Sequence, residues 1–327
     1  MNKPVLFLFV VVLSACSCNP EKNPKGIVNS QPIVQLPPVP RFNADSAYSF
    51  VQAQCDFGPR VPNTKAHAAC AEFLAEKMKS YTPHVIVQKG VVKTFDNVQL
   101  NFQNIIASFN PESKNRVLLF AHWDTRPWAD KDTSKNDQPN LGADDGGSGV
   151  GILMEVARQL SMNKISIGID IVFFDAEDWG TRATDADNPD SYALGAQYWA
   201  NKPHVAGYSA NYGILLDMTG AKNARFYMEG TSMYYASGIV RKVWDIANRS
   251  GFSDYFIYKE IGFITDDHLY VNRLLNIPSI NIIHTDSDGH FGSHWHTHRD
   301  NMDVIDRSTL NAVGQTLLEV IFSETGV

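Results

Sequence analysis

Hydrophobic and polar positions near the start of this chain follow first a helical and then an extended period. Apolar residues recur at helical spacing in residues 44–56 and 65–80, which predicts a helix in each segment. Residues 84–95 and 100–110 are rich in β-branched and aromatic side chains. They predict two strands joined by a hairpin or a short loop.

Beyond residue 115, short apolar runs alternate with helical patterns, and no internal repeat is visible. The runs expected to be strands are residues 116–122, 167–178, 212–218 and 277–283. The helical patterns are residues 148–162, 191–202, 232–250 and 308–324. Strands that alternate with helices of this length predict α/β architecture with a largely parallel sheet.

Four of these strands end in a similar way, with apolar residues followed by His, Asp or Glu, as in "LLFAHWD" and "IVFFDAED". Ligands of open α/β sheets bind beyond the carboxyl ends of the strands, so we expect a site there. Its candidate residues are His122, Asp124, Asp144, Asp145, Asp175, Glu177, Asp178, Asp217, Asp266, Asp267, His268, His294, His296 and His298. One such residue alone is typical of a helix cap. Together, His and carboxylate groups without Cys favour a catalytic zinc site.

Composition narrows the class of protein. The chain has 327 residues, 44% of them hydrophobic and 19% charged, which suits one large domain or two small ones. The net charge of −7 gives no support to a nucleic-acid or anionic-membrane partner. No apolar stretch after residue 15 is long enough to span a membrane.

The N-terminus has the pattern of a targeting segment. Residues 1–15 hold one Lys and a short apolar run, which predicts a signal peptide. "LSAC" is similar to a bacterial lipobox, which predicts a lipid on Cys16; an ordinary secretory signal with an incidental Cys is the alternative. Residues 16–42 are expected to be a tether and residues 43–327 a single catalytic domain. We therefore expect an exported protein, facing the periplasm or the cell exterior and held to the membrane only by its lipid.

Several other residues carry weaker expectations. Cys55 and Cys70 form either a disulfide or two buried thiols, because spacing alone does not show that their Cβ atoms can meet. Lys65 and His67 are expected in a solvated helix start. His294 and His298 flank His296 and are expected to face solvent if the segment is extended, since side chains alternate along a strand.

The motifs, taken in order, resemble those of the zinc-dependent aminopeptidase family, and more narrowly those of glutaminyl-peptide cyclotransferases. The resemblance runs from about residue 45 to the end, through "AHWDTRP", "GADDGGSGVG", "FFDAEDWG", "LLDMTG" and "SHWHTHRDN". It implies a three-layer α/β/α sandwich around a twisted, mostly parallel central sheet.

Two branches of that family use the same residues differently. In the aminopeptidase branch two zinc ions are implied, one on Asp145, Asp178 and His296 and the other on His122 and Asp217, with Asp145 bridging. In the cyclase branch a single zinc is implied, on the first set. The presence of His122 and Asp217 therefore does not separate the two.

Three features favour the cyclase branch. Trp295 directly precedes His296, "TDDH" resembles a cyclase segment in which Asp266 shares a network with Asp217, and "HWDTRPW" resembles the cyclase loop after the first strand. The chain departs from many relatives at Asp178, where Glu is usual. Asp is one methylene shorter but still an oxygen ligand. Ala121, where animal cyclases have Cys, points to the bacterial branch.

The cyclase resemblance implies conversion of an N-terminal Gln of peptides or proteins to pyroglutamate with release of ammonia, with one zinc per chain and a monomer as the expected form. Glu177 would move the protons. Asp217 and Asp266 would bind the α-amine and stabilise the leaving-group geometry, and Trp295 and Trp179 would line the pocket. The alternatives are a di-zinc aminopeptidase, in which Glu177 activates water, and a binding protein on an inactive hydrolase scaffold.

Overall fold

The computed structural model describes residue 1 and residues 38–324. The predicted signal peptide, Cys16 and most of the predicted tether lie outside the described residues. The helices are α1 (Ala44–Cys55), α2 (Lys65–Lys79), α3 (Gly147–Met162), the short 3₁₀ helix η1 (Pro189–Ser191), α4 (Leu194–Asn201), α5 (Gly230–Arg249), α6 (Asp267–Leu275) and α7 (Arg307–Ser323). The strands are β1 (Val85–Lys93), β2 (Gln99–Phe109), β3 (Arg116–His122), β4 (Gly168–Phe174), β5 (Tyr212–Asp217), β6 (Phe226–Met228), β7 (Phe256–Glu260) and β8 (Ser279–Ile283).

The central sheet has six strands in the order β1-β2-β4-β3-β5-β8. Strands β4, β3, β5 and β8 are parallel, while β2 runs antiparallel to both β1 and β4. Every residue of β3, β4, β5 and β8 is buried, as expected where helices cover both faces of a parallel sheet. The predicted α/β architecture is confirmed.

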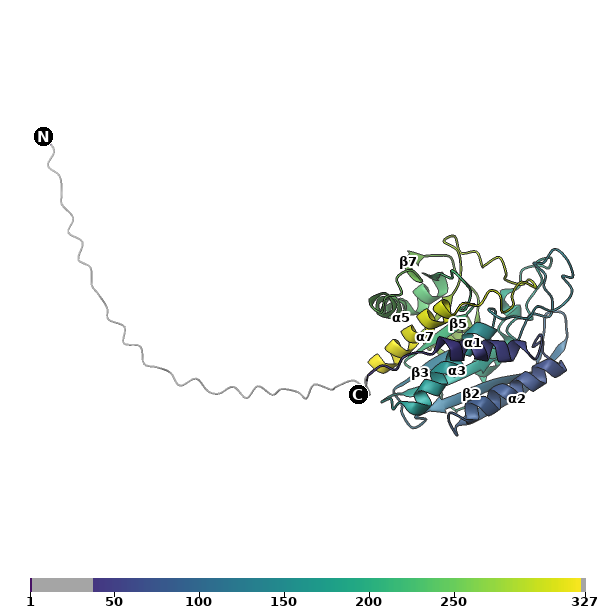
Figure 1. The fold of residues 1–327 in the computed structure, drawn as a ribbon, viewed down its shortest axis with the longest axis horizontal. Helices are drawn as coiled ribbons and strands as arrows, with labels where there is room; N and C mark the ends of the chain where they lie inside the picture. The colour runs from purple at the N-terminus through teal and green to yellow at the C-terminus, as the bar shows by residue number, and fades with distance from the viewer. Residues whose placement is uncertain (2–37, 325–327) are drawn as a thin grey trace. The chain divides into compact units, whose positions relative to one another are not determined.

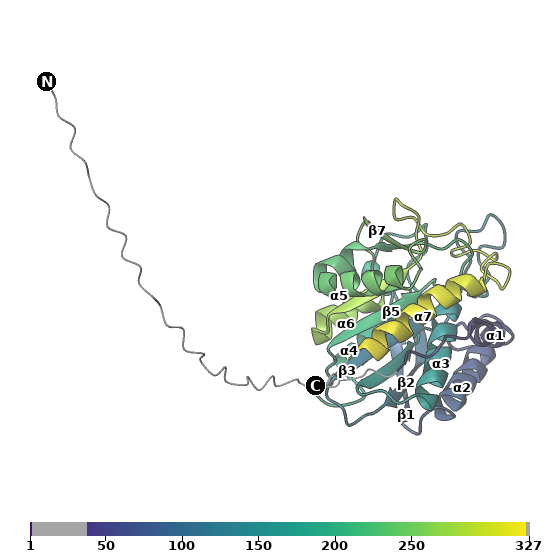
Figure 2. The ribbon, with the colours of Figure 1, turned by 60° about the vertical axis from the view of Figure 1, so that its left-hand side comes forward.

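Side chains that alternate along β3 divide the core into two layers. Val117 and Leu119 pack in the cluster formed with α1, α2, α3 and α7, whereas Leu118 and Phe120 pack in the cluster formed with α4 and α6. Figure 1 shows the first group of helices in front of the strands, and in Figure 2 α4 and α6 lie on the other side. The fold is therefore the three-layer α/β/α sandwich that the resemblance implied.

The glycines before α3 bring that helix close to the sheet. A Cβ added to Gly149 would lie 2.3 Å from the backbone oxygen of Leu216 in β5, so only glycine allows this approach. Gly146, with φ of 87°, ends the preceding loop, and α3 begins without a side-chain cap. "DDGGSG" is thus a close-packing motif that places Asp145 next to the end of β5, rather than an N-capping sequence.

The predicted helices at residues 44–56 and 65–80 and the strand pair at 84–110 are confirmed as α1, α2 and the β1–β2 hairpin. Strands β6 and β7, which form a second small parallel sheet, and helix α6 were not predicted. They are short, so their apolar residues show little periodicity. Cys55 and Cys70 are free thiols in the core, and no disulfide joins them.

Candidate functional site

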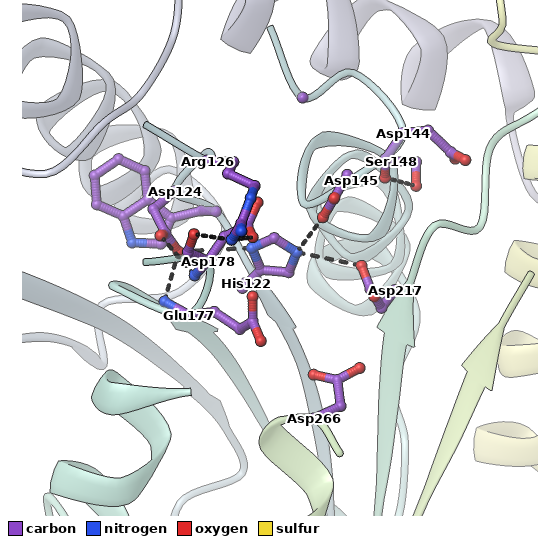
Figure 3. Close-up of polar contacts among 12 residues, drawn as sticks. His122, Asp124, Arg126, Asp144, Asp145, Ser148, Glu177, Asp178, Asp217 and Asp266 are labelled. Carbon is purple, nitrogen blue, oxygen red and sulfur yellow. Dashed lines mark hydrogen bonds and ion pairs between the residues drawn. The ribbon is translucent and has the colours of Figure 1, made fainter. Parts of the chain in front are cut away.

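Strand ends and two loops converge at the carboxyl edge of the central sheet, as predicted. His122 ends β3 and Asp217 ends β5, while Glu177 and Asp178 follow β4. Asp145 enters from the loop before α3 (Figure 3), and His296 enters from the loop before α7. All six side chains are buried or nearly so. The structure therefore gathers acidic and imidazole groups from distant segments into one site.

Asp145, Asp178 and His296 form the first group of possible metal ligands. His296 Nε2 lies 3.2 Å from Asp178 Oδ1 and 3.6 Å from Asp145 Oδ2. Ligand bonds to tetrahedral zinc of about 2.0–2.2 Å place neighbouring ligand atoms about 3.3–3.6 Å apart. Within the described residues, Asp145 Oδ2 and Asp178 Oδ2 are buried without a hydrogen-bond partner, which is unfavourable unless a cation is nearby. The group therefore fits zinc.

His122, Asp145 and Asp217 form a second group that shares Asp145 with the first. His122 Nε2 lies 3.0 Å from Asp145 Oδ1 and 3.2 Å from Asp217 Oδ1 (Figure 3). Burial disfavours the charged imidazole, but Asp124, Asp145 and Asp217 outweigh it and hold the pKa of His122 well above its usual range. The oxygens of this group thus have a partner within the protein.

Two buried aspartates hold the backbone on either side of the first group. The Asp124 carboxylate accepts hydrogen bonds from the N–H groups of Glu177 (3.0 Å) and Asp178 (3.2 Å). In the same way, Asp300 accepts from Asp144 N (2.7 Å) and Asp145 N (3.1 Å). Charge-assisted bonds to successive N–H groups fix a turn firmly. The loops that carry Asp145 and Asp178 are therefore positioned by side chains distant in the sequence.

Three residues at the site have a left-handed backbone conformation. Ala176 (φ 54°) precedes Glu177, Met218 (φ 47°) follows Asp217, and His296 itself has φ of 54°. Non-glycine residues in this region cost about 1–3 kcal/mol and persist where the surrounding structure imposes them. Some backbone strain therefore lies in the turns that aim the site's side chains.

Three carboxyl groups in the site have raised pKa values. Burial raises the pKa of Glu177 well above its usual value, and the neighbouring charges of Asp178 and Asp266 add to this although His122 opposes it. Burial also raises the pKa of Asp217 to about 8, and it raises that of Asp266. Figure 3 shows the Glu177 and Asp266 carboxylates pointing toward one another. Shifts of this kind are typical of groups that transfer protons.

These groups open on a cavity of about 360 Å³. Its lining residues are Asp145, Glu177, Asp178, Asp187, Pro189, Tyr192, Asp217, Met218, Phe263, Ile264, Thr265, Asp266, Ile283, Gly289, Phe291, Trp295 and His296. The Trp295 ring stacks on His296 with centroids 3.8 Å apart and contacts Phe291 at 4.6 Å. Trp179 lies outside this lining and packs edge-on against Trp128, with centroids 5.7 Å apart.

The predicted exposure of His294 and of His67 is wrong, and that of His298 is only partly met. His294 is buried, with Nε2 2.8 Å from Asp144 Oδ2, and His298 is half-buried, with Nδ1 2.9 Å from Asp132 Oδ2. The segment is a series of turns rather than a strand, so alternation does not apply. His67 is also buried and lies 2.9 Å from both carboxylate oxygens of Asp175.

A family model, Peptidase family M28, matches residues 104–321. The chain belongs to this family. A Zn-dependent exopeptidase from Parabacteroides distasonis is 54% identical to this M28 chain, with a TM-score of 0.86 over 88% of this chain and all of that one. A glutaminyl cyclase from Bacteroides thetaiotaomicron, bound to N-acetylhistamine, is 50% identical, also with a TM-score of 0.86 over 88% of this chain and all of that one. The glutaminyl-peptide cyclotransferase of Drosophila melanogaster is 26% identical over 77% of this chain and 73% of its own.

Sequence patterns did not reveal the residues that support the site of this M28 chain. Asp124 was a candidate without a role, and Arg126, Asp130 and Asp300 were not candidates. Arg126 is fully buried, which is rare for Arg. Its position shortly after a strand that ends in the site was the one signal that pointed to it.

Proposed function

We propose that this M28 chain is a glutaminyl-peptide cyclotransferase. It would convert N-terminal Gln to pyroglutamate by joining the α-amine nitrogen to the side-chain carbonyl carbon, while the bond from that carbon to the amide nitrogen breaks and ammonia leaves. No water is consumed. The observation that carries the proposal is Glu177, a buried carboxyl beside the three proposed zinc ligands, facing a small cavity walled by Trp295. The identity of 50% to a glutaminyl cyclase supports it.

Glu177 would carry the proton transfers. Zinc on Asp145, Asp178 and His296 would supply a Lewis acid that polarises the side-chain carbonyl. As a carboxylate, Glu177 would take a proton from the attacking α-amine and deliver it to the departing nitrogen. A pKa raised well above the usual value suits both roles, because the group must accept and then release a proton near neutral pH.

Asp217 and Asp266 would orient the reacting end of the substrate. Both line the cavity together with Glu177, and their oxygens can accept hydrogen bonds from the α-amine. Asp266 is itself fixed, because Oδ2 accepts from Asn281 Nδ2 at 2.7 Å. The Trp295 indole, which stacks on His296, would contact the Gln side chain. This contact would favour the folded-back conformation from which the five-membered lactam ring closes.

We propose one zinc per chain, on the first group of ligands. The Oδ2 atoms that lack a hydrogen-bond partner among the described residues belong to Asp145 and Asp178, both of the first group. The second group adds only His122 and Asp217, and Oδ1 of Asp217 already lies 3.2 Å from His122 Nε2. The second candidate function, a di-zinc aminopeptidase, is favoured by the spacing of this second group and by the similarity to an exopeptidase. In that function His122 would be a ligand.

We also propose that the chain is an exported lipoprotein attached through Cys16 and that it acts as a monomer. The last residues of the predicted tether, 16–42, belong to the folded domain, because Phe42 is 3% exposed and packs in the core. The targeting pattern of residues 1–15 supports export. Among residues 38–324, no helix is both long and apolar enough to cross a membrane. A tethered enzyme would meet exported polypeptides that begin with Gln.

The test is a product assay on protein lacking residues 1–18. The protein is incubated with a Gln-initiated and a Leu-initiated peptide, and ammonia and product mass are read. We expect ammonia and a mass loss of one ammonia from the first peptide, with the second left intact. Release of free Leu would instead establish the aminopeptidase, and inactivity on both peptides with zinc bound would favour the binding-protein alternative.

A further inference from the structure

Arg126 places a buried guanidinium in contact with the proposed zinc site. Its side chain is 1% exposed. Nε and Nη2 donate to the two carboxylate oxygens of Asp130 at 2.8 and 3.0 Å, and Nη2 also donates to Thr181 O at 2.9 Å. Nη1 donates to Asp178 twice, to its backbone oxygen at 3.1 Å and to Oδ1 at 3.3 Å. Arg126 therefore contacts the side chain of a proposed ligand directly (Figure 3).

Asp130 extends this contact to a second proposed ligand. Its Oδ1 lies 3.5 Å from Nδ1 of His296, the ring nitrogen that faces away from Asp145 and Asp178. Its Oδ2 also accepts from Ala183 N at 2.8 Å. The contact with His296 is at an ion-pair distance and is not a hydrogen bond, since His296 Nδ1 has no hydrogen-bond partner among the described residues. A carboxylate beside the second nitrogen of a metal-binding His favours one orientation of the ring. One Arg–Asp pair thus contacts two of the three proposed ligands.

Neither Arg126 nor Asp130 lines the cavity of about 360 Å³ that would hold the substrate. Both instead line a neighbouring cavity of about 190 Å³, which shares Trp295 and His296 with the first. Their direct contacts with the zinc site are those with Asp178 and His296. The Asp178 side chain is short, so its carboxylate reaches a metal over a narrow range of backbone positions. The structure holds Asp178 from two sides, at its N–H by Asp124 (3.2 Å) and at its carbonyl and carboxylate oxygens by Arg126.

We propose that Arg126 and Asp130 are a positioning pair, which holds the Asp178 carboxylate and the His296 ring in the orientation that binds zinc. The planar guanidinium reaches two carboxylates and two backbone oxygens at once, and an ammonium has no such fixed geometry. The inference rests on the zinc site of the proposed function. It does not depend on which substrate the site transforms.

The test compares Arg126→Lys with wild type in the full-length chain, and Arg158→Lys is the matched control. Arg158 makes a similar two-pronged contact with Glu155, at 2.6 and 2.8 Å, on α3. Zinc affinity is measured by competition with a chromophoric chelator. We expect Arg126→Lys to bind zinc about 10–100-fold more weakly and Arg158→Lys to match wild type. An Arg126→Lys protein that is folded and binds zinc like wild type overturns the proposal.

Asp130→Asn is the second variant, and it leaves the guanidinium in place. We expect weaker zinc binding from it, with a smaller loss than in Arg126→Lys, because only the support of His296 is removed directly. The double variant should lose less than the product of the two single losses, since the residues act as one unit. If the two single losses of zinc affinity multiply in the double variant, the residues act independently and the proposal of a pair is overturned.

Zinc affinity and cyclase activity are measured separately, so the failure of this proposal can be told from the failure of the proposed function. Weaker zinc binding by Arg126→Lys together with no cyclase activity in wild type would support the pair and refute the cyclase. Wild type that binds no zinc would refute both.

Discussion

The two groups of possible metal ligands share Asp145 and differ in what completes them. In the first group, Oδ2 of Asp145 and Oδ2 of Asp178 are buried without a partner among the described residues. In the second group, the facing oxygens of Asp145 and Asp217 both lie within 3.2 Å of Nε2 of His122. Asp178 Oδ1 likewise lies 3.2 Å from Nε2 of His296, so a facing imidazole is common to both groups. What differs is the pair of buried Oδ2 atoms in the first group, which lack a hydrogen-bond partner unless a cation is present.

The supports behind the two groups differ as well. Behind the first lie the Asp124 carboxylate, which holds the backbone of Asp178, and the Arg126–Asp130 pair. Behind the second, Asp124 Oδ1 lies 3.5 Å from Nδ1 of His122. Metal-binding residues need their own partners to hold them in place. By this criterion the first group is the more firmly preorganised for zinc.

The largest expected effect is on zinc binding, and it tests whether only the first group holds the metal. His296→Gln removes a ligand from the first group only, and His122→Gln removes the imidazole of the second. We expect His296→Gln to purify without zinc and without activity, and His122→Gln to retain zinc. The metal content of each protein is measured by mass spectrometry of the digested sample. Loss of half of a two-zinc complement in His122→Gln would show instead that both groups bind metal.

Glu177→Gln tests the group proposed to transfer the protons. Because Gln cannot exchange the proton, we expect kcat for ammonia release to fall about 10²–10⁴-fold. Zinc content should not change, since Glu177 is not among the proposed ligands. Steady-state kinetics on a Gln-initiated peptide check the first expectation and metal analysis the second. A variant that loses zinc would place Glu177 in the metal site.

The second group should also respond to pH in metal-free protein. Burial raises the pKa of Asp217 from 3.8 to about 8. Between about pH 4 and pH 8 the folded state keeps a proton that the unfolded state has released, so this group's contribution to stability falls as pH rises. Asp217→Asn removes the titration. We therefore expect the variant to gain stability relative to wild type from pH 5 to pH 8.

Urea unfolding midpoints of both metal-free proteins at several pH values measure this difference. A difference between variant and wild type that stays constant across the range would show that Asp217 does not hold its proton in the folded state.

The smallest expected effect is on KM, and it should differ between Trp295 and Trp179. Trp295 lines the cavity and stacks on His296, whereas Trp179 packs against Trp128 outside the lining. We expect Trp295→Ala to raise KM for a Gln-initiated peptide about tenfold, in line with the value of an aromatic contact. Trp179→Ala should change KM less. Equal increases in KM for the two variants would indicate that Trp179 also contacts the substrate.

Periodicity and strand-end chemistry predicted much of this protein. Buried runs such as β3 and β4 and amphipathic helices such as α1 and α2 have patterns set by which faces meet the core. Parallel strands share a carboxyl edge, so the positions of His122 and Asp217 at strand ends are enough to predict that both belong to one site. The short elements β6, β7 and α6 lack enough residues to display a period.

Tertiary structure alone decided how those residues are held. Asp300 holds Asp145 from 155 positions away, and Arg126 contacts Asp178 across 52 positions. Local pattern cannot predict such pairs, because it reports which face of an element is buried and not which distant side chain meets it. The burial of His294 has the same origin, since its turn and its partner Asp144 are both set by long-range packing. The sequence by itself determined the α/β class, the largely parallel sheet and the place of the site, because these follow from local periodicity and strand ends. Long-range contacts decided the strand order and the geometry of the site.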